Sequence, residues 1–169
     1  EHPFNVSSYE SPDANHVQKA IRYVSEVFKE DIIREDKVEN PDEVTFMTKG
    51  RNENDYVLRM LNSKKALDTI ARGMPNPDTM VYGKAAVMVV DYKPGDNIDT
   101  LKERIQKAKE RYITDNPFNL DGSPYIPRIV LIPGLCAITM GGSQKVAENA
   151  YPALLDTVYT MDGAEAFGG

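Results

Sequence analysis

The sequence predicts an α/β fold, in which helices flank a mainly parallel sheet. Two short segments, residues 85–91 (AAVMVVD) and 128–132 (RIVLI), are almost continuously apolar, as is typical of strands that are buried on both faces. An amphipathic helical pattern lies between them. Two buried strands that are joined through a helix should pair in parallel with a right-handed crossover. This βαβ unit predicts a layered, Rossmann-like domain.

The length and composition predict one globular domain. A chain of 169 residues that is 41% hydrophobic and 27% charged can bury a core without metals or disulfides. Residues 1–12 show little periodicity, so we expect a flexible arm there and a single α/β domain over residues 13–169. The chain begins without methionine and stops after AFGG, and we therefore expect a fragment of a larger protein.

The charge of the chain narrows the classes of partner. Lys and Arg number 20 and Asp and Glu number 26, which gives a net charge of −6. This balance argues against nucleic-acid binding, which needs a basic surface. No apolar run approaches the roughly 20 residues of a membrane span, so we expect no membrane partner. The single cysteine, Cys136, forms no internal disulfide, which favours a cytoplasmic location.

The first part of the chain predicts one long helix and then a strand. From Asn15 onward, apolar residues recur at the spacing of one helix face, and either Asp13 or Asn15 is a suitable N-cap. These apolar residues are Val17, Ala20, Ile21, Val24, Val27, Phe28 and Ile32. Pro41 lies in a polar stretch, so the helix should end before it. Residues 43–49 (EVTFMTK) alternate and contain β-formers, which predicts a strand.

Shorter elements are predicted next. Residues 55–61 and 64–72 show helical patterns, and Ser63 is a suitable cap for the second helix. A turn at residues 74–78 contains two prolines and leads to a short strand at residues 79–82.

The clearest helical pattern connects the two buried strands. Its apolar face consists of Ile98, Leu101, Ile105, Ala108 and Tyr112. The basic residues of the opposite face alternate with Glu103 and Glu110, which indicates an ion-paired outer face and no nucleic-acid stripe.

The C-terminal part is predicted to hold a loop, two strands and a helix. The loop covers residues 116–127, and a second strand at residues 135–139 follows the strand at 128–132. The last helix runs from Gln144 to about Met161, and Pro152 should kink or split it.

Few side chains are candidates for metal binding or nucleophilic catalysis. A zinc site needs three or four suitable ligands, whereas this chain has only His2, His16 and Cys136, far apart in sequence. We therefore predict no such metal site, although carboxylate sites for magnesium have no fixed spacing and stay open. Cys136 follows a buried strand, where α/β proteins often place their sites. Its neighbours are apolar and no histidine is near in sequence, which favours a core role.

A glycine-rich turn is the candidate ligand-binding site. Gly141, Gly142 and Ser143 lie between an apolar strand and a helix, so their backbone N–H groups could face an anion, and Gly134 belongs to the same candidate set. The spacing fits neither a Walker loop nor the GxGxxG motif. A tight turn that ends in a serine N-cap would explain the same residues.

The second half of the chain resembles a known family of two-enzyme proteins. The motifs are Leu61-Asn62-Ser63, Gly73, Asn76-Pro77-Asp78, the stretch PRIVLIPGL at 127–135, and Ala164-Glu165-Ala166. Over roughly residues 61–169 they resemble the connecting region of bifunctional class II aldolase/short-chain dehydrogenase proteins, of the rhamnulose-1-phosphate aldolase/alcohol dehydrogenase type. Two positions depart from the family pattern. Thr79 replaces a histidine, and Cys136 replaces a glycine.

The resemblance implies that the catalytic motifs lie outside this chain. In the family, zinc is bound by the aldolase domain and NAD(P) by the dehydrogenase domain, and neither set of motifs occurs here. The chain would then need no cofactor of its own, and its partners would be the flanking aldolase and dehydrogenase domains. The resemblance also suggests a degenerate aldolase-like lobe as an alternative to the Rossmann-like fold.

Three functions are therefore open. The first is a non-catalytic domain of a carbohydrate-metabolising aldolase/NAD(P)-dependent dehydrogenase. The second is a domain that binds a phosphorylated sugar or a nucleotide through the turn at residues 134–143. The third is a stand-alone enzyme with a carboxylate-based site, whose catalytic residues the sequence does not identify.

Overall fold

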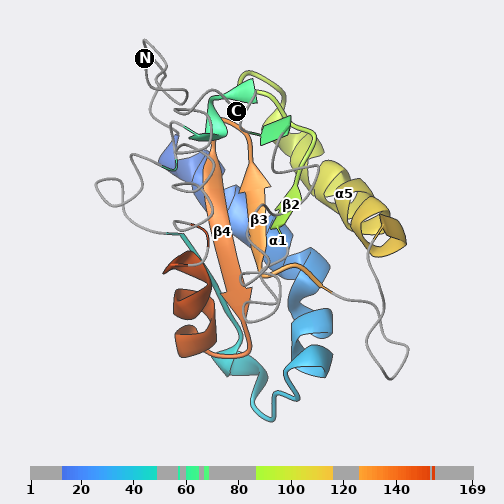
Figure 1. Cartoon of the computed structure of the whole chain (residues 1–169), viewed down its shortest axis with the longest axis vertical. Coiled ribbons are helices and arrows are strands. Elements are labelled where there is room, and N and C mark those ends of the chain that lie inside the picture. Colours follow the sequence, from blue (N-terminus) through green and yellow to red (C-terminus); the bar gives the residue numbers. More distant parts are fainter. Residues whose placement is uncertain are drawn as a thin grey trace, which may run out of the picture.

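A computed structural model describes residues 13–48, 57, 60–64, 67–68, 87–115, 126–152 and 154. The chain order of the elements is α1 (Ala14–Glu35), η1 (Pro41–Glu43), β1 (Thr45–Met47), β2 (Val87–Val89), η2 (Ile98–Thr100), α5 (Leu101–Asp115), β3 (Ile129–Ile132) and β4 (Cys136–Gly141). Residues 144–152 are also helical. The structure is shown in Figure 1.

The long helix α1 confirms the first helical prediction. Asp13 is its N-cap, and the Asp13 carboxylate accepts a hydrogen bond of 2.7 Å from the backbone N–H of Asn15. The buried residues Ala20, Val24, Phe28 and Ile32 are four positions apart, so they form one stripe. The helix ends before Pro41, as predicted.

The end of α1 is closed by a reversal of the backbone. Lys37 has a φ of +53°, in the left-handed region where glycine is usual. The N–H of Val38 then donates to the carbonyl of Ile33 at 3.0 Å, which is the long-range bond of a Schellman motif. This reversal directs Val38 and the carboxylate of Asp36 toward the sheet, because both contact Gly142.

The sheet is mixed, with the strand order β1-β4-β3-β2. Only β2 and β3 pair in parallel, whereas β3 with β4 and β1 with β4 are antiparallel. The prediction of a mainly parallel, Rossmann-like sheet was therefore wrong. Three residues, 133–135, separate β3 from β4, and a parallel connection needs a crossover of a dozen or more. These two strands consequently form a hairpin.

The parallel pairing of the two strands in the predicted βαβ unit is confirmed. β2 and β3 are parallel neighbours, with Val87 opposite Ile129, and α5 lies between them in sequence and packs on β2. Asn97 caps the helical turn η2, which leads directly into α5. β4 extends to Gly141, two residues beyond the predicted strand at 135–139.

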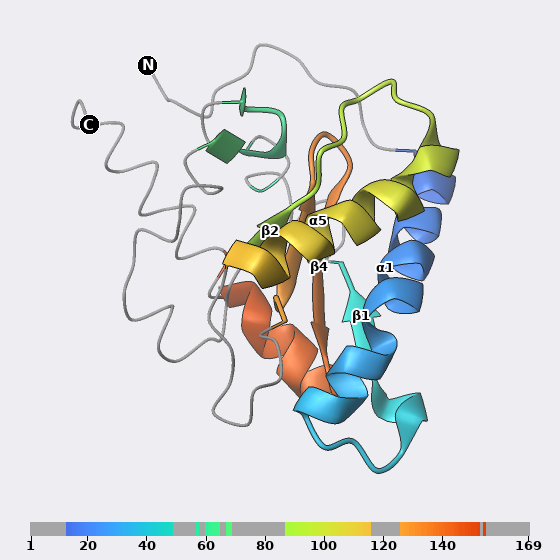
Figure 2. The same ribbon diagram turned by 90° about the vertical axis from the view of Figure 1, so that its right-hand side faces the viewer.

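Both faces of the sheet are covered. On one face, α1 and α5 pack on side chains from β2, β3 and β4 (Figure 2). On the other face, Ile129 and Leu131 of β3 pack with Ala150, Tyr151 and Leu154. Because neighbouring residues of a strand point to opposite faces, Val130 and Ile132 belong to the first core and Ile129 and Leu131 to the second. This arrangement confirms that RIVLI is buried on both sides.

The basic residues of α5 are ion-paired, as predicted, and several of their partners lie outside the helix. Lys107 pairs with Glu103 within α5, at 3.2 Å. Lys102 pairs with Glu26 of α1 at 3.1 Å, and Lys109 donates to Asp31 of α1 at 2.5 Å. Charged residues of α5 therefore also fasten α1 to the domain.

Several predictions fall largely or wholly outside the described residues. They are the arm at residues 1–12, the strand at 79–82 and most of the loop at 116–127. Of the two helices predicted between residues 55 and 72, the described positions, which include Val57, Met60 and Leu67, are helical. Within the described part of the chain, no helix is long and apolar enough to cross a membrane.

Candidate functional site

The candidate ligand-binding residues lie at the two ends of β4. Gly134 is in the turn before the strand, and Gly141 is its last residue. A strand rises by about 3.3 Å per residue, so these two glycines are roughly 20 Å apart. Gly134 therefore does not share one site with Gly142 and Ser143, and a ligand-binding role for the four residues stays a prediction.

Gly134 lies close to the loop that follows β2. Its φ is +70°, and a Cβ atom at this position would overlap Cγ of Pro94. The N–H of Gly134 donates to the carbonyl of Leu61 at 3.0 Å. Both the left-handed backbone and the close approach of Pro94 require a glycine here.

The turn at residues 141–143 connects β4 to the last helix. A Cβ atom at Gly141 would be 2.5 Å from Cγ1 of Val146 and 2.9 Å from the backbone nitrogen of Ala147. The hydroxyl of Ser143 accepts a hydrogen bond of 3.3 Å from the N–H of Val146, and its carbonyl accepts one of 3.1 Å from Ala147. Ser143 is thus the N-cap of this helix, as the structural interpretation of the turn predicts.

The middle residue of the turn binds a carboxylate of the chain itself. The N–H of Gly142 donates to Oδ2 of Asp36 at 2.7 Å. A Cβ atom at Gly142 would be 2.7 Å from Cγ2 of Val38 and 2.8 Å from Cβ of Asp36. The N–H of Gly142, which precedes the N-cap Ser143, is therefore occupied by Asp36 and is not free for an anionic ligand.

A buried arginine completes this arrangement. Arg128 donates from Nη1 to Oδ2 of Asp36 at 2.8 Å and from Nη2 to Oδ1 at 2.5 Å. The side chains of Arg128 and Asp36 are only 6% and 17% exposed. Such a two-bond pair is both strong and specific in geometry. We call Asp36, Arg128 and Gly142 the Asp36 clasp, which ties the end of α1 to the start of β3 and to the turn after β4.

The pairing of Asp36 with Arg128 is not predictable from local sequence patterns. They are 92 positions apart, and Asp36 and Gly142 are 106 apart, so no local pattern links them. One signal was available in the sequence. Arg128 directly precedes an apolar strand that is buried on both faces, and a charge in such a position needs a partner.

A second polar cluster fixes the loop after β2. Arg104 of α5 donates to Oδ2 of Asp96 at 3.0 Å and to the carbonyl of Asp91 at 2.9 Å. The hydroxyl of Tyr92 donates to the carbonyl of Asp96 at 3.0 Å. Burial raises the pKa of Tyr92, and the charge of Asp96 raises it further, while Arg104 acts in the opposite direction. These bonds hold Pro94, which neighbours Gly134, in place.

Cys136 is a core residue. Its side chain is buried, and burial raises the pKa of the thiol from 9.0 to about 12. A nucleophilic cysteine has a lowered pKa, because the thiolate is the reactive form. The core interpretation of Cys136 is therefore confirmed.

Metal ligands do not gather in the described part of the chain. His16 lies in the first turn of α1, far in sequence from Cys136. Among the described residues, no group of three or more His, Cys, Asp or Glu side chains is placed to hold a metal ion.

A comparison with protein families identifies the domain. The family model described as aldolase class II, second domain, matches residues 30–169, which is most of the chain. No curated protein and no solved structure matches this chain. The match confirms the class II aldolase part of the resemblance inferred from the sequence. The chain belongs to the family of class II aldolase second domains.

Proposed function

We propose that this chain is a non-catalytic domain that supports a class II aldolase catalytic domain in a carbohydrate-metabolising protein of the cytoplasm. The observation that carries the proposal is the Asp36 clasp. A helix N-terminus at the end of a sheet is a common position for phosphate groups. Here the N–H of Gly142, directly before the N-cap of the last helix, and the guanidinium of Arg128 both bind an internal carboxylate.

The clasp supports a structural role because of its burial. Arg128 is almost completely inaccessible, and removing Asp36 from it would leave a charge without its partner inside the protein. An external anion would have to displace a carboxylate that accepts hydrogen bonds from both donors. A ligand site that must compete with such a pair would be weak, whereas a structural connection is strengthened by it.

In this proposal, the cofactors are bound by neighbouring domains and not by this chain. The described residues do not supply the three or four ligands that zinc requires. Following the resemblance to the bifunctional family, we place zinc in an adjoining aldolase domain and NAD(P) in a fused short-chain dehydrogenase. A dehydrogenase sequence in the same gene would support the fusion, and a gene without one would contradict it.

Thermal unfolding tests the non-catalytic role. The whole chain is heated alone and with inorganic phosphate, glucose 6-phosphate, NAD⁺ or zinc chloride. We expect no rise in Tm with any of them. A ligand at a hundredfold excess over its Kd would add about 2.7 kcal/mol to the free energy of unfolding, which such a scan detects easily. A saturable rise in Tm would contradict the proposal.

The alternative is a domain that binds a phosphorylated sugar or a nucleotide. It is favoured by the chemistry of the clasp, because Gly142 and Arg128 do bind a carboxylate in this structure. If glucose 6-phosphate raises the Tm, the variant Gly142→Asp should abolish the effect, since it adds a negative charge at the turn. Binding that survives this substitution would exclude the turn as the site.

A further inference from the structure

The family match begins inside a helix. It starts at residue 30, whereas α1 runs from Ala14 to Glu35. The first sixteen residues of α1, 14–29, therefore lie before the part of the chain that the family model recognises. Three of them, Ala20, Val24 and Phe28, are 0% exposed, so this segment is deeply buried along one face.

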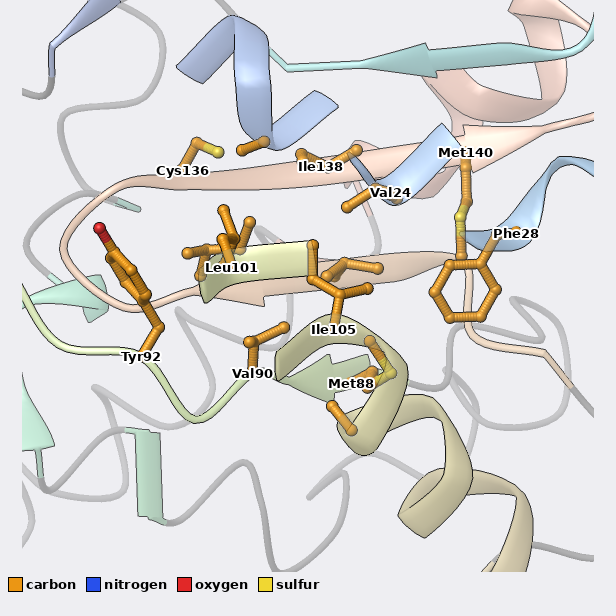
Figure 3. Packing of buried hydrophobic residues seen from close by; sticks show 14 of the residues in the cluster. Val24, Phe28, Met88, Val90, Tyr92, Leu101, Ile105, Cys136, Ile138 and Met140 are labelled. Atoms are coloured by element: carbon orange, nitrogen blue, oxygen red, sulfur yellow. The ribbon is translucent and has the colours of Figure 1, made fainter. Parts of the chain in front are cut away.

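The surface that buries these side chains belongs to the matched part. Val24 and Phe28 share one hydrophobic core with side chains of β2, α5 and β4 (Figure 3). These side chains include Met88, Leu101, Ile105, Ile138 and Met140. All of them lie within residues 30–169, and we call the apolar surface that they present to α1 the groove.

Polar contacts fix the position of the segment along the groove. Lys102 of α5 donates to Oε2 of Glu26 at 3.1 Å. Lys109 of α5 donates to the carbonyl of Val27 at 3.2 Å and lies 5.3 Å from the centre of the Phe28 ring. Asp13 caps the first turn of the helix. The segment thus has its own N-cap, an apolar face and charged contacts to α5. A helix that binds in a groove of another protein has the same features.

We propose that residues 13–29 are an in-chain helical ligand that completes the core of the second domain. The cooperative unit of this protein then begins at Asp13 and not where the family similarity begins. This inference is independent of the proposed function, because it concerns which residues close the groove and not what the domain binds.

Hydrogen exchange on the whole chain tests the inference. The variant Val24→Ala removes methyl groups from the groove, and Gln18→Ala, at an exposed position of the same segment, is its control. Val24→Ala should speed exchange in α5, β3 and β4 by roughly 10- to 100-fold, the range expected when a buried side chain is truncated. Gln18→Ala should leave these rates unchanged.

Two results would overturn the proposal. Exchange could accelerate within residues 14–29 alone, which would make the segment a separate appendage. Exchange in Val24→Ala could also equal that in Gln18→Ala, which would show that the groove does not need this side chain. A stronger pair of substitutions, Val24→Asp and Gln18→Asp, extends the test. If only Val24→Asp fails to fold, the inference is supported. If both variants fold normally, it is contradicted.

Discussion

The carboxylate of Asp36 accepts a hydrogen bond of 2.7 Å from the backbone N–H of Gly142, 106 positions further along the chain. The same carboxylate binds the buried guanidinium of Arg128, at the start of the central strand β3. One side chain therefore holds together the end of α1, the strand β3 and the turn before the last helix. These three segments meet at one end of the sheet, and the stability of this end should depend on the pair.

Asp36→Ala should lower the free energy of unfolding by about 3 kcal/mol. The substitution leaves the Arg128 charge buried without its carboxylate, and breaking a buried pair in this way typically costs 3–5 kcal/mol. Urea denaturation at neutral pH measures the change. Asp42→Ala, at an exposed position, is the control and should change stability by less than about 0.5 kcal/mol. A loss below about 1 kcal/mol for Asp36→Ala would contradict a buried, structural pair.

The double variant Asp36→Ala/Arg128→Leu should recover part of this loss. Removing both charges eliminates the uncompensated guanidinium, and apolar replacements of buried pairs are often close to neutral. Comparison of the two single variants and the double variant gives the coupling energy of the pair. Purely additive effects would show that the two side chains act independently.

Gly141→Ala should destabilise the protein by about 1–3 kcal/mol, because it overpacks the start of the last helix. The new Cβ would be 2.9 Å from the backbone nitrogen of Ala147, which cannot move without disturbing the helix. Thermal or urea unfolding measures the loss. Ser143→Ala, which removes only the N-cap, should cost about 1 kcal/mol and is a suitable comparison. A neutral Gly141→Ala would mean that the turn is more open than its geometry indicates.

Lys37→Gly should stabilise the protein by up to about 1 kcal/mol. Lys37 has a φ of +53° at the end of α1, and a residue with a side chain is strained in this region whereas glycine is not. The control is Glu39→Gly, because Glu39 is exposed and its φ is not positive. The control should be neutral or slightly destabilising, since glycine increases the entropy of the unfolded chain. Equal effects of the two substitutions would exclude relief of backbone strain.

The sequence predicted the parts of the fold that local patterns determine. The four-residue repeat of Ala20, Val24 and Phe28 identified α1, and the apolar run at residues 128–132 identified a strand buried on both faces. The serine cap at Ser143 was also predictable, because capping uses only neighbouring residues.

Properties that depend on distant residues could not be predicted in this way. The strand order was missed because β1 pairs with β4 across more than 90 positions, and hydrophobic periodicity does not specify partners. The short turn around Gly134 was nevertheless a hairpin signal, and it should have favoured an antiparallel β3–β4 pair. The clasp between Asp36 and Gly142 arises only once the pairing of β1 with β4 brings these two residues close together.

Burial of Cys136 should make stability depend on pH above neutrality. Its pKa is raised from 9.0 to about 12, so the folded protein keeps the thiol protonated while the unfolded chain loses the proton near pH 9. The unfolded state then binds fewer protons, and stability falls as the pH rises through this window. At pH 10 the loss due to this thiol should be about 1.4 kcal/mol.

Cys136→Ala removes this part of the pH dependence, so its difference in stability from the natural chain should shrink by that amount between pH 8 and pH 10. Urea denaturation at the two pH values measures both proteins under the same conditions, and the tyrosines and lysines that they share cancel. A difference that is constant between the two pH values would show that the thiol titrates normally in the folded state and is therefore accessible to water.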